Sequence, residues 1–119
     1  MKKDLETTIE SMLELRELEK KIELRRLAIK CSQLESDIFN EEDSDFIDYR
    51  IIRNKERAIE NNIEKMSRLS DVPFNKIRKL IYYDPCQTWG EYFDQFRAVG
   101  VSIATQEEVE EYEKSINRK

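Results

Sequence analysis

The stretch NIEKMSRLSDVPFNKIRKLIY, residues 62–82, decides the fold of this 119-residue chain. Two short runs with helical apolar spacing flank the turn-forming segment Asp71-Val72-Pro73. Pro73 suits the opening of a helix because its φ is already helical and its missing N–H would be unpaired there. The apolar positions of the two runs are Met66, Leu69, Ile77, Leu80 and Ile81. A short helix, a tight turn and a second short helix are the pattern of a helix-turn-helix.

The residues around the turn suit this geometry. Ser67 is small where the two helices would cross most closely. Asp71 stands at the position that requires a positive φ, which Asp tolerates better than most residues. Val72 would fill the space between the turn and the core. We therefore expect a first helix ending near Leu69 and a second helix over residues 73–82.

The second helix of this motif carries the candidate functional residues. Asn75, Arg78, Lys79 and Tyr82 share its outward face, with Phe74 and Lys76 at the margins. Asparagine can bond to adenine N6 and N7, arginine and lysine to guanine O6 and N7, and all three to phosphates. The sequence therefore predicts Asn75, Arg78 and Lys79 as base-reading residues.

The charge distribution agrees with this choice. The chain has 21 basic and 26 acidic residues, a net charge of −5. Residues 49–83 hold 9 basic and 4 acidic side chains, whereas residues 1–48 hold 8 and 14, and residues 84–119 hold 4 and 8. A basic centre between acidic flanks can face a polyanion. The alternative is a solvated basic helix face without a ligand.

Upstream of the motif, residues 4–39 contain no helix breaker and are expected to form one long helix. Apolar residues at spacings of 3, 4, 3 and 4 form a heptad-like seam: Leu24, Leu27, Cys31, Leu34 and Ile38. A second apolar stripe lies roughly opposite, at Leu15, Leu18, Ile22 and Ile29. We interpret the helix as an oligomerisation element with the seam as its interface. The alternative is a helix within an intrachain bundle.

Capping patterns divide the rest of the chain. The acidic segment NEEDSD, residues 40–45, ends the long helix, and Ser44 or Asp45 would cap a helix over residues 46–59. Asn61 with Glu64 resembles a capping box that starts the first helix of the motif. Asp84-Pro85 would end the second helix of the motif. Further capping boxes and a left-handed cap are expected at Thr88 with Glu91, Gly100, and Thr105 with Glu108.

The fold expected from these elements is all-α. A long coiled-coil-like helix, residues 1–40, would serve oligomerisation. A small helix-turn-helix bundle of about five helices would follow over residues 46–117.

Residues 63–103 resemble the phage repressor/Cro-type helix-turn-helix family. MSRLSDVPFNKIRKL, residues 66–80, has that family's small residue, turn, valine and two apolar positions three apart. TWGEYFDQFRAVGVSI, residues 88–103, resembles its following helix. The chain departs from the family by Asp71 in place of glycine, Ser67 in place of alanine, and Ile63 in place of a phosphate-binding glutamine, beside which Asn62 stands. The resemblance implies DNA binding, with backbone or flanking contacts at Arg53, Asn62, Lys65, Phe74, Lys76 and Tyr82.

Several functions are excluded by the residues present. The chain has no histidine, so catalytic triads with an imidazole base and histidine-containing zinc sites are absent. Two glycines are too few for a phosphate-cradling loop. Cys31 and Cys86 form neither a disulfide framework nor a CxxC site. We expect no enzyme, no cofactor, no metal site and no membrane segment.

The sequence therefore predicts a sequence-specific transcriptional regulator, with double-stranded DNA and a second copy of the chain as partners. The homodimer would form through residues 4–39. The resemblance implies a phage or other mobile element and a cytoplasmic, nucleoid-associated location. The alternative is a protein-interaction module or inhibitor that captures a basic partner through the acidic N-terminal helix.

Overall fold

The computed structural model describes the backbone of residues 2–83 and 88–117 and the side chains of residues 12–81 and 88–115. Within those residues the regular structure is entirely helical, which confirms the expected all-α class. The elements are α1 (Lys2–Glu42), α2 (Tyr49–Ser70), α3 (Phe74–Tyr83), α4 (Trp89–Ala98) and α5 (Gln106–Asn117). Asp84-Pro85, the expected stop of α3, and Cys86 lie outside the described residues.

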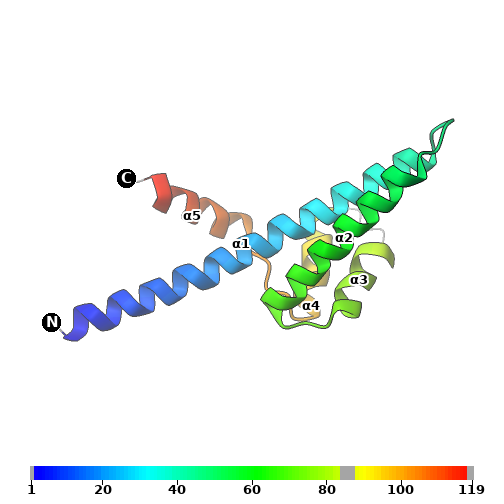
Figure 1. Cartoon of the computed structure of the whole chain (residues 1–119). Helices are drawn as coiled ribbons and strands as arrows, with labels where there is room; N and C mark the ends of the chain where they lie inside the picture. Colours follow the sequence, from blue (N-terminus) through cyan, green and yellow to red (C-terminus); the bar gives the residue numbers. More distant parts are fainter. Residues whose placement is uncertain (1, 84–87, 118–119) are drawn as a thin grey trace.

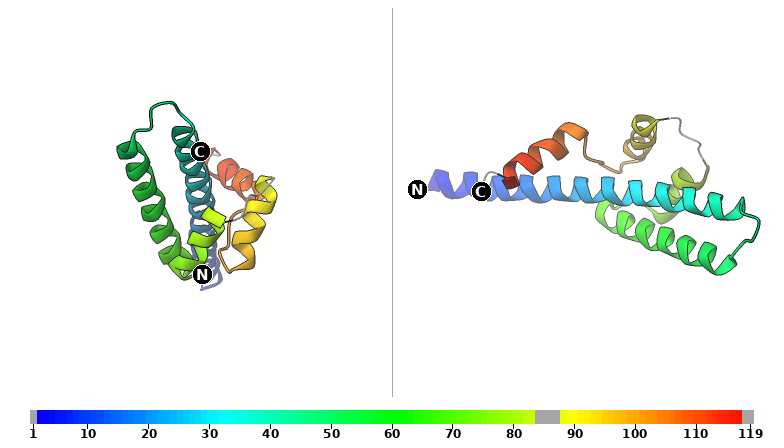
Figure 2. Two further views of the ribbon diagram at one scale, coloured as in Figure 1. Left: turned by 90° about the vertical axis from the view of Figure 1, so that its right-hand side faces the viewer. Right: turned by 90° about the horizontal axis from the view of Figure 1, so that it is seen from above.

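The helices are arranged around α1, which runs the length of an elongated molecule of 67 × 31 × 26 Å (Figure 1). Helix α2 folds back along the C-terminal half of α1, and the two form an antiparallel hairpin. Helices α3 and α4 lie against this hairpin near the end of α2 (Figure 2). Helix α5 turns back toward the N-terminal half of α1, which extends beyond the bundle.

The heptad-like seam of α1 lies inside this hairpin. All five seam residues are buried, and the Cys31 thiol donates a hydrogen bond of 3.9 Å to the carbonyl of Ile59. Helix α2 supplies the opposing stripe, which consists of Ile52, Ile59, Ile63 and Met66. The expected oligomer interface at Leu24, Leu27, Cys31, Leu34 and Ile38 is therefore wrong. These residues form the intrachain core, which was the alternative reading of the helix.

The hydrophobic core does not divide at residue 40. It is one cluster that includes residues of α1, α2, α3 and α4 and the segment after α4. The expected separation into an oligomerisation helix, residues 1–40, and a domain, residues 46–117, is corrected accordingly. The C-terminal half of α1 belongs to the same folded unit as the helix-turn-helix.

Helix α2 is continuous, which corrects the expected break at Asn61. No glycine or proline occurs from residue 49 to residue 70, and Asn61 is exposed within the helix. The buried stripe runs past this position from Ile59 to Ile63, so burial outweighs the local capping preference of Asn61 and Glu64. The motif is therefore built from the last turns of a 22-residue helix.

The start of α2 also differs from expectation. Asp48, not Ser44 or Asp45, caps the helix, and its Oδ1 accepts the N–H of Arg50 at 3.0 Å. The Ser44 hydroxyl instead shares its proton between the carbonyls of Glu41 and Phe46, at 2.8 and 3.0 Å. These bonds fix the loop between α1 and α2, and α1 extends to Glu42.

The later caps are confirmed. Thr88 Oγ1 accepts the N–H of Glu91 at 3.1 Å. Thr105 and Glu108 form a reciprocal capping box, with both side chain–backbone bonds at 3.1 Å. Gly100 has φ 103° and ends α4 in a Schellman motif, because its N–H bonds to Arg97 O and that of Val101 to Phe96 O.

Candidate nucleic-acid interface

The turn between α2 and α3 has the conformation that the sequence predicts. Asp71 ends α2 in the left-handed region, at φ 59° and ψ 28°, and its N–H bonds to Ser67 O at 2.8 Å. Ser67 does more than allow a close approach, because its hydroxyl donates a bond of 2.6 Å to Val72 O. Val72 is buried, so the turn is attached to the core by its side chain and by these bonds.

The start of α3 is fixed by the next residues. The Ser70 hydroxyl donates to Met66 O at 2.7 Å and accepts the Val72 N–H at 3.3 Å. The carbonyl of Pro73 accepts the N–H groups of Lys76 and Ile77, at 3.1 and 3.4 Å. The turn is therefore held by side chain–backbone bonds at the end of α2 and by backbone bonds at the start of α3.

Helix α3 has a buried side and an exposed side. Ile77 and Ile81 are buried, while Phe74 and Leu80 are partly buried against the core. The exposed side carries Asn75, Lys76, Arg78 and Lys79. The structure thus brings the three predicted base-reading residues together on one accessible face.

Three of the predicted DNA backbone or flanking contacts lie on α3: Lys76, Phe74 and Tyr82. Lys76 is exposed beside the base-reading residues. Phe74 is partly buried, and its ring packs against the core. The side chain of Tyr82 lies outside the described residues.

The predicted contacts on α2 do not all join this face. Asn62 is half-buried on α2 and its side chain affects the Cys31 thiol of α1, so it does not join the exposed face of α3. Lys65 is close enough to Glu23 of α1 to help lower the pKa of that carboxyl, after the stronger effect of Arg26. Arg53 is exposed, and its Nε lies 3.5 Å from Tyr49 O.

Several basic side chains of α2 form ion pairs. On α2, Lys55 pairs with Asp37 at 3.2 Å, Arg50 with Asp48 at 3.9 Å, and Arg68 with Glu64. These carboxylates offset part of the basic centre. Helix α3 itself holds Lys76, Arg78 and Lys79 and no acidic residue. Its exposed face is therefore suited to an anionic ligand.

The connector between α4 and α5 supports the turn from behind. An ideal Cβ on Gly100 would lie 3.5 Å from Val72 Cγ2, which places this glycine directly against the turn. Val101, Ile103 and Ala104 are buried. The connector therefore joins the helix-turn-helix to α1.

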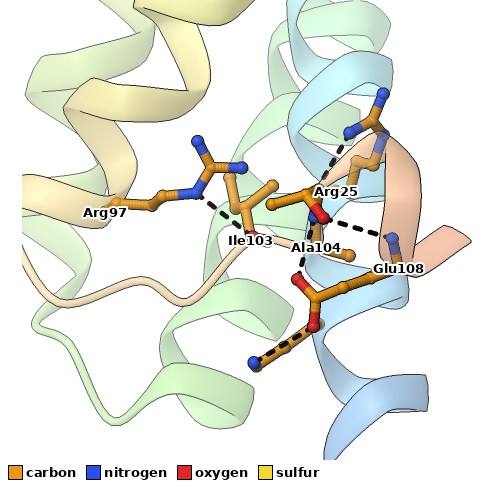
Figure 3. A network of polar contacts seen from close by, with 7 residues as sticks. Arg25, Arg97, Ile103, Ala104 and Glu108 are labelled. Atoms are coloured by element: carbon orange, nitrogen blue, oxygen red, sulfur yellow. Dashed lines mark hydrogen bonds and ion pairs between the residues drawn. The ribbon is translucent and has the colours of Figure 1, made fainter.

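Polar contacts fix the connector on α1 (Figure 3). Arg25 donates to Ala104 O at 3.0 Å and to Gln106 Oε1 at 2.9 Å, and its guanidinium lies 4.7 Å from the centre of the Phe93 ring. Arg97 Nε bonds to Ile103 O at 3.3 Å. The Ala104 N–H bonds to Lys21 O at 3.1 Å, and Lys21 pairs with Glu108 at 3.3 Å.

Sequence reasoning missed Arg25 and Lys21 as part of this support. Both lie in an acidic helix where a cation normally signals only a solvated face, and no local spacing connects them with residues about 80 positions later. A comparable case is Tyr92, whose hydroxyl bonds to Ala28 O at 2.8 Å and holds α4 on α1. Its aromatic neighbours indicated a core helix but not this partner.

Burial raises the pKa of the Cys31 thiol to about 12, so it stays protonated and is no nucleophile. No group of three potential metal-ligating side chains occurs among the residues described. Over the same residues, no helix combines the length and apolar character needed to cross a bilayer.

Comparison with protein-family models, with characterised proteins and with solved structures finds no match to this chain.

Proposed function

We propose that the chain is a sequence-specific DNA-binding transcriptional regulator that reads the major groove with α3. The observation that carries this proposal is the exposed face of α3, where Asn75, Arg78 and Lys79 lie on a helix of fixed direction. An amide and two cations on such a face can make the bidentate contacts that distinguish base pairs in the major groove.

The rigidity of the motif supports this use. The left-handed turn at Asp71, the buried Val72 and the Ser67 hydroxyl bond hold α3 against α2. The connector holds the turn from the other side through Gly100. A helix supported in this way can place side chains at base edges without first ordering itself.

Dimerisation requires a different surface from the heptad-like seam, which is buried. The N-terminal half of α1 exposes Met12, Leu13 and Leu15, and it extends beyond the bundle (Figure 1). We propose that two chains pair through this segment. Two-fold symmetry would then place the α3 helices at inverted half-sites about 34–36 Å apart, or a multiple of that distance.

Regulation by such a protein would be steric or recruiting control at a promoter. The resemblance to phage repressors suggests a phage or other mobile element and action in the cytoplasm on nucleoid DNA. The proposal includes no catalytic activity and no cofactor.

The experiment begins with selection of bound sequences from random duplex DNA, followed by fluorescence-anisotropy titration of the best sequence. We expect Asn75→Ala and Arg78→Ala each to weaken binding by about 1–3 kcal/mol. Affinity should fall steeply with added salt, because phosphate neutralisation releases counterions. Asn40→Ala and Lys114→Ala, exposed positions on α1 and α5, are the matched controls and should change little. Unchanged binding by the Asn75→Ala/Arg78→Ala double variant would contradict the assignment of α3.

A protein-interaction module is the second candidate, and a groove between α1 and α5 favours it. Leu13 and Leu18 line this groove together with Lys21 and four acidic side chains, which are Glu14, Glu17, Glu108 and Glu111. A basic amphipathic partner would fit these groups. Absence of salt-dependent DNA binding, together with a protein partner whose binding is lost in Leu13→Glu, would favour this function.

A further inference from the structure

The end of the α1–α2 hairpin carries an unusual concentration of exposed apolar side chains. We define the hairpin tip as residues 39–51. Phe39, Phe46 and Tyr49 are 70, 92 and 65% exposed, and Ile47 and Ile51 are also exposed. Four other large apolar side chains are exposed among the described residues: Met12, Leu13 and Leu15, which lie together on α1, and Trp89 on α4. A cluster of exposed apolar side chains marks an interaction site, whereas single exposed apolar side chains need no explanation.

The tip is an ordered structure. The Asp43 N–H bonds to Phe39 O at 3.1 Å, and the Asp48 N–H bonds to Glu41 Oε1 at 3.0 Å. The Ser44 hydroxyl links the carbonyls of Glu41 and Phe46. These bonds fix the backbone on both sides of Phe46. The exposed Phe46 ring is therefore presented to solvent by an ordered loop. A partner that covers Phe46 would not have to order this loop first.

The charge of the tip restricts what can cover it. Residues 39–51 hold five carboxylates and one basic residue, Arg50, which pairs with Asp48. Two copies that paired through their tips would bring the five carboxylates of each chain together. DNA and anionic lipid surfaces would be repelled in the same way. A protein surface with lysine and arginine around an apolar groove would bind both the apolar side chains and the carboxylates of the tip.

The tip is also far from the proposed DNA-reading helix. It lies at the N-terminal end of α2, whereas α3 follows the C-terminal end, and 22 helical residues span about 33 Å. A partner at the tip would not cover Asn75, Arg78 or Lys79. Both surfaces can be occupied at the same time.

We propose that the hairpin tip is a protein-docking surface, with Phe46 as the central anchor in an apolar groove bordered by lysine and arginine on the partner. Phe39 and Tyr49 extend the apolar contact, and Glu42, Asp43 and Asp45 face the basic border. This role does not depend on DNA binding.

A phage-displayed library of random peptides, selected on the immobilised full chain, provides the test. Recovered peptides should combine large apolar residues with lysine and arginine, and added salt should weaken their binding. Phe46→Ala should weaken the best peptide about tenfold or more, as expected for the loss of a buried aromatic anchor. Because Phe46 is 92% exposed, this variant should fold normally. Trp89→Ala, which removes a half-exposed aromatic residue from α4, is the control and should bind as the wild type does.

A second variant tests the role of the carboxylates at the tip. Asp43→Asn with Asp45→Asn should reduce the salt dependence of peptide binding and the lysine and arginine content of newly selected peptides. Recovery of peptides without basic residues, binding that is insensitive to Phe46→Ala, or no enrichment at all would overturn the proposal. Self-association that Phe46→Ala abolishes in sedimentation would also overturn it. Neither Phe46→Ala nor the control should alter DNA binding, so failure here is distinguishable from failure of the regulator function.

Discussion

Asp71 sits in a conformation that costs most L-residues about 1–2 kcal/mol. Asp71→Val should therefore lower the free energy of unfolding by about 1–2 kcal/mol, because a β-branched side chain tolerates a positive φ poorly. Asp71→Gly should leave stability unchanged within about 1 kcal/mol, since relief of strain is offset by greater freedom of the unfolded chain. Urea denaturation followed by circular dichroism measures both changes.

Glu60→Val, at an exposed helical position of α2, is the control for the valine substitution. It should change stability by no more than about 0.5 kcal/mol. Equal losses in Asp71→Val and Glu60→Val would show that the left-handed turn is not the cause.

Glu108 gives the molecule a pH dependence that can be measured. Its carboxylate accepts the Thr105 N–H and pairs with Lys21, and both interactions lower its pKa from 4.5. A lowered pKa in the folded state means that the stabilisation is present above pH 4.5 and is lost as the pH falls through the folded-state value. Glu108→Gln should therefore cost about 0.5–1 kcal/mol at neutral pH and almost nothing in acid.

The measurement is urea denaturation of wild type and Glu108→Gln over a series of pH values. Glu110→Gln, an exposed neighbour on α5, is the control. A difference between wild type and Glu108→Gln that stays constant into acid would contradict the role of the carboxylate charge.

At the residue scale, local features were predictable and distant partners were not. The Thr88 and Thr105 caps, the left-handed Asp71 and the Gly100 cap depend on residues within a few positions, and a single sequence contains that information. Asn62 was predicted as a DNA contact, and its half-buried side chain also affects Cys31, which is 31 positions away. Which side of α2 meets α1 is decided by tertiary packing, which spacing alone does not determine.

At the scale of elements, the hairpin of α1 and α2 carries much of the core. Leu27→Ala should lower the free energy of unfolding by about 2–5 kcal/mol, because Leu27 is buried between helices of one chain. The loss should be independent of protein concentration, since the partner is intramolecular. Lys30→Ala, at an exposed position of the same helix, should cost far less. Thermal unfolding at several concentrations makes the comparison.

If the thermal unfolding midpoint of the wild type depended on protein concentration, and Leu27→Ala abolished that dependence, the heptad-like seam would be a subunit interface. That outcome would contradict the intrachain packing of α1 on α2.

The elements also show why two expectations failed. The seam of α1 was visible in the sequence, but a 3,4 spacing is the same whether the opposing helix belongs to another chain or to this one. The interruption at Asn61 followed a real capping pattern, yet the buried stripe of α2 continues through it. The helical class and the left-handed turn between α2 and α3 were predictable because each rests on several agreeing signals.

At the scale of the whole molecule, oligomeric state depends on the extended half of α1. Leu13→Glu with Leu15→Glu should convert the proposed dimer to a monomer in sedimentation equilibrium, because the pair places two charges in an apolar contact. The loss of a second half-site should also weaken operator binding. Phe46→Ala should leave the dimer intact. A wild-type protein that sediments as a monomer, alone and on DNA, would contradict the pairing.

The most direct measurement of the central claim is chemical protection of guanine N7 in the bound duplex, because N7 is open only in the major groove. The account predicts protected guanines in two half-sites related by two-fold symmetry, and it predicts that Arg78→Ala or Lys79→Ala removes protection at particular positions in each half-site. Protection that is the same in wild type and in both variants, or bound DNA without any major-groove protection, would show that α3 does not read the bases.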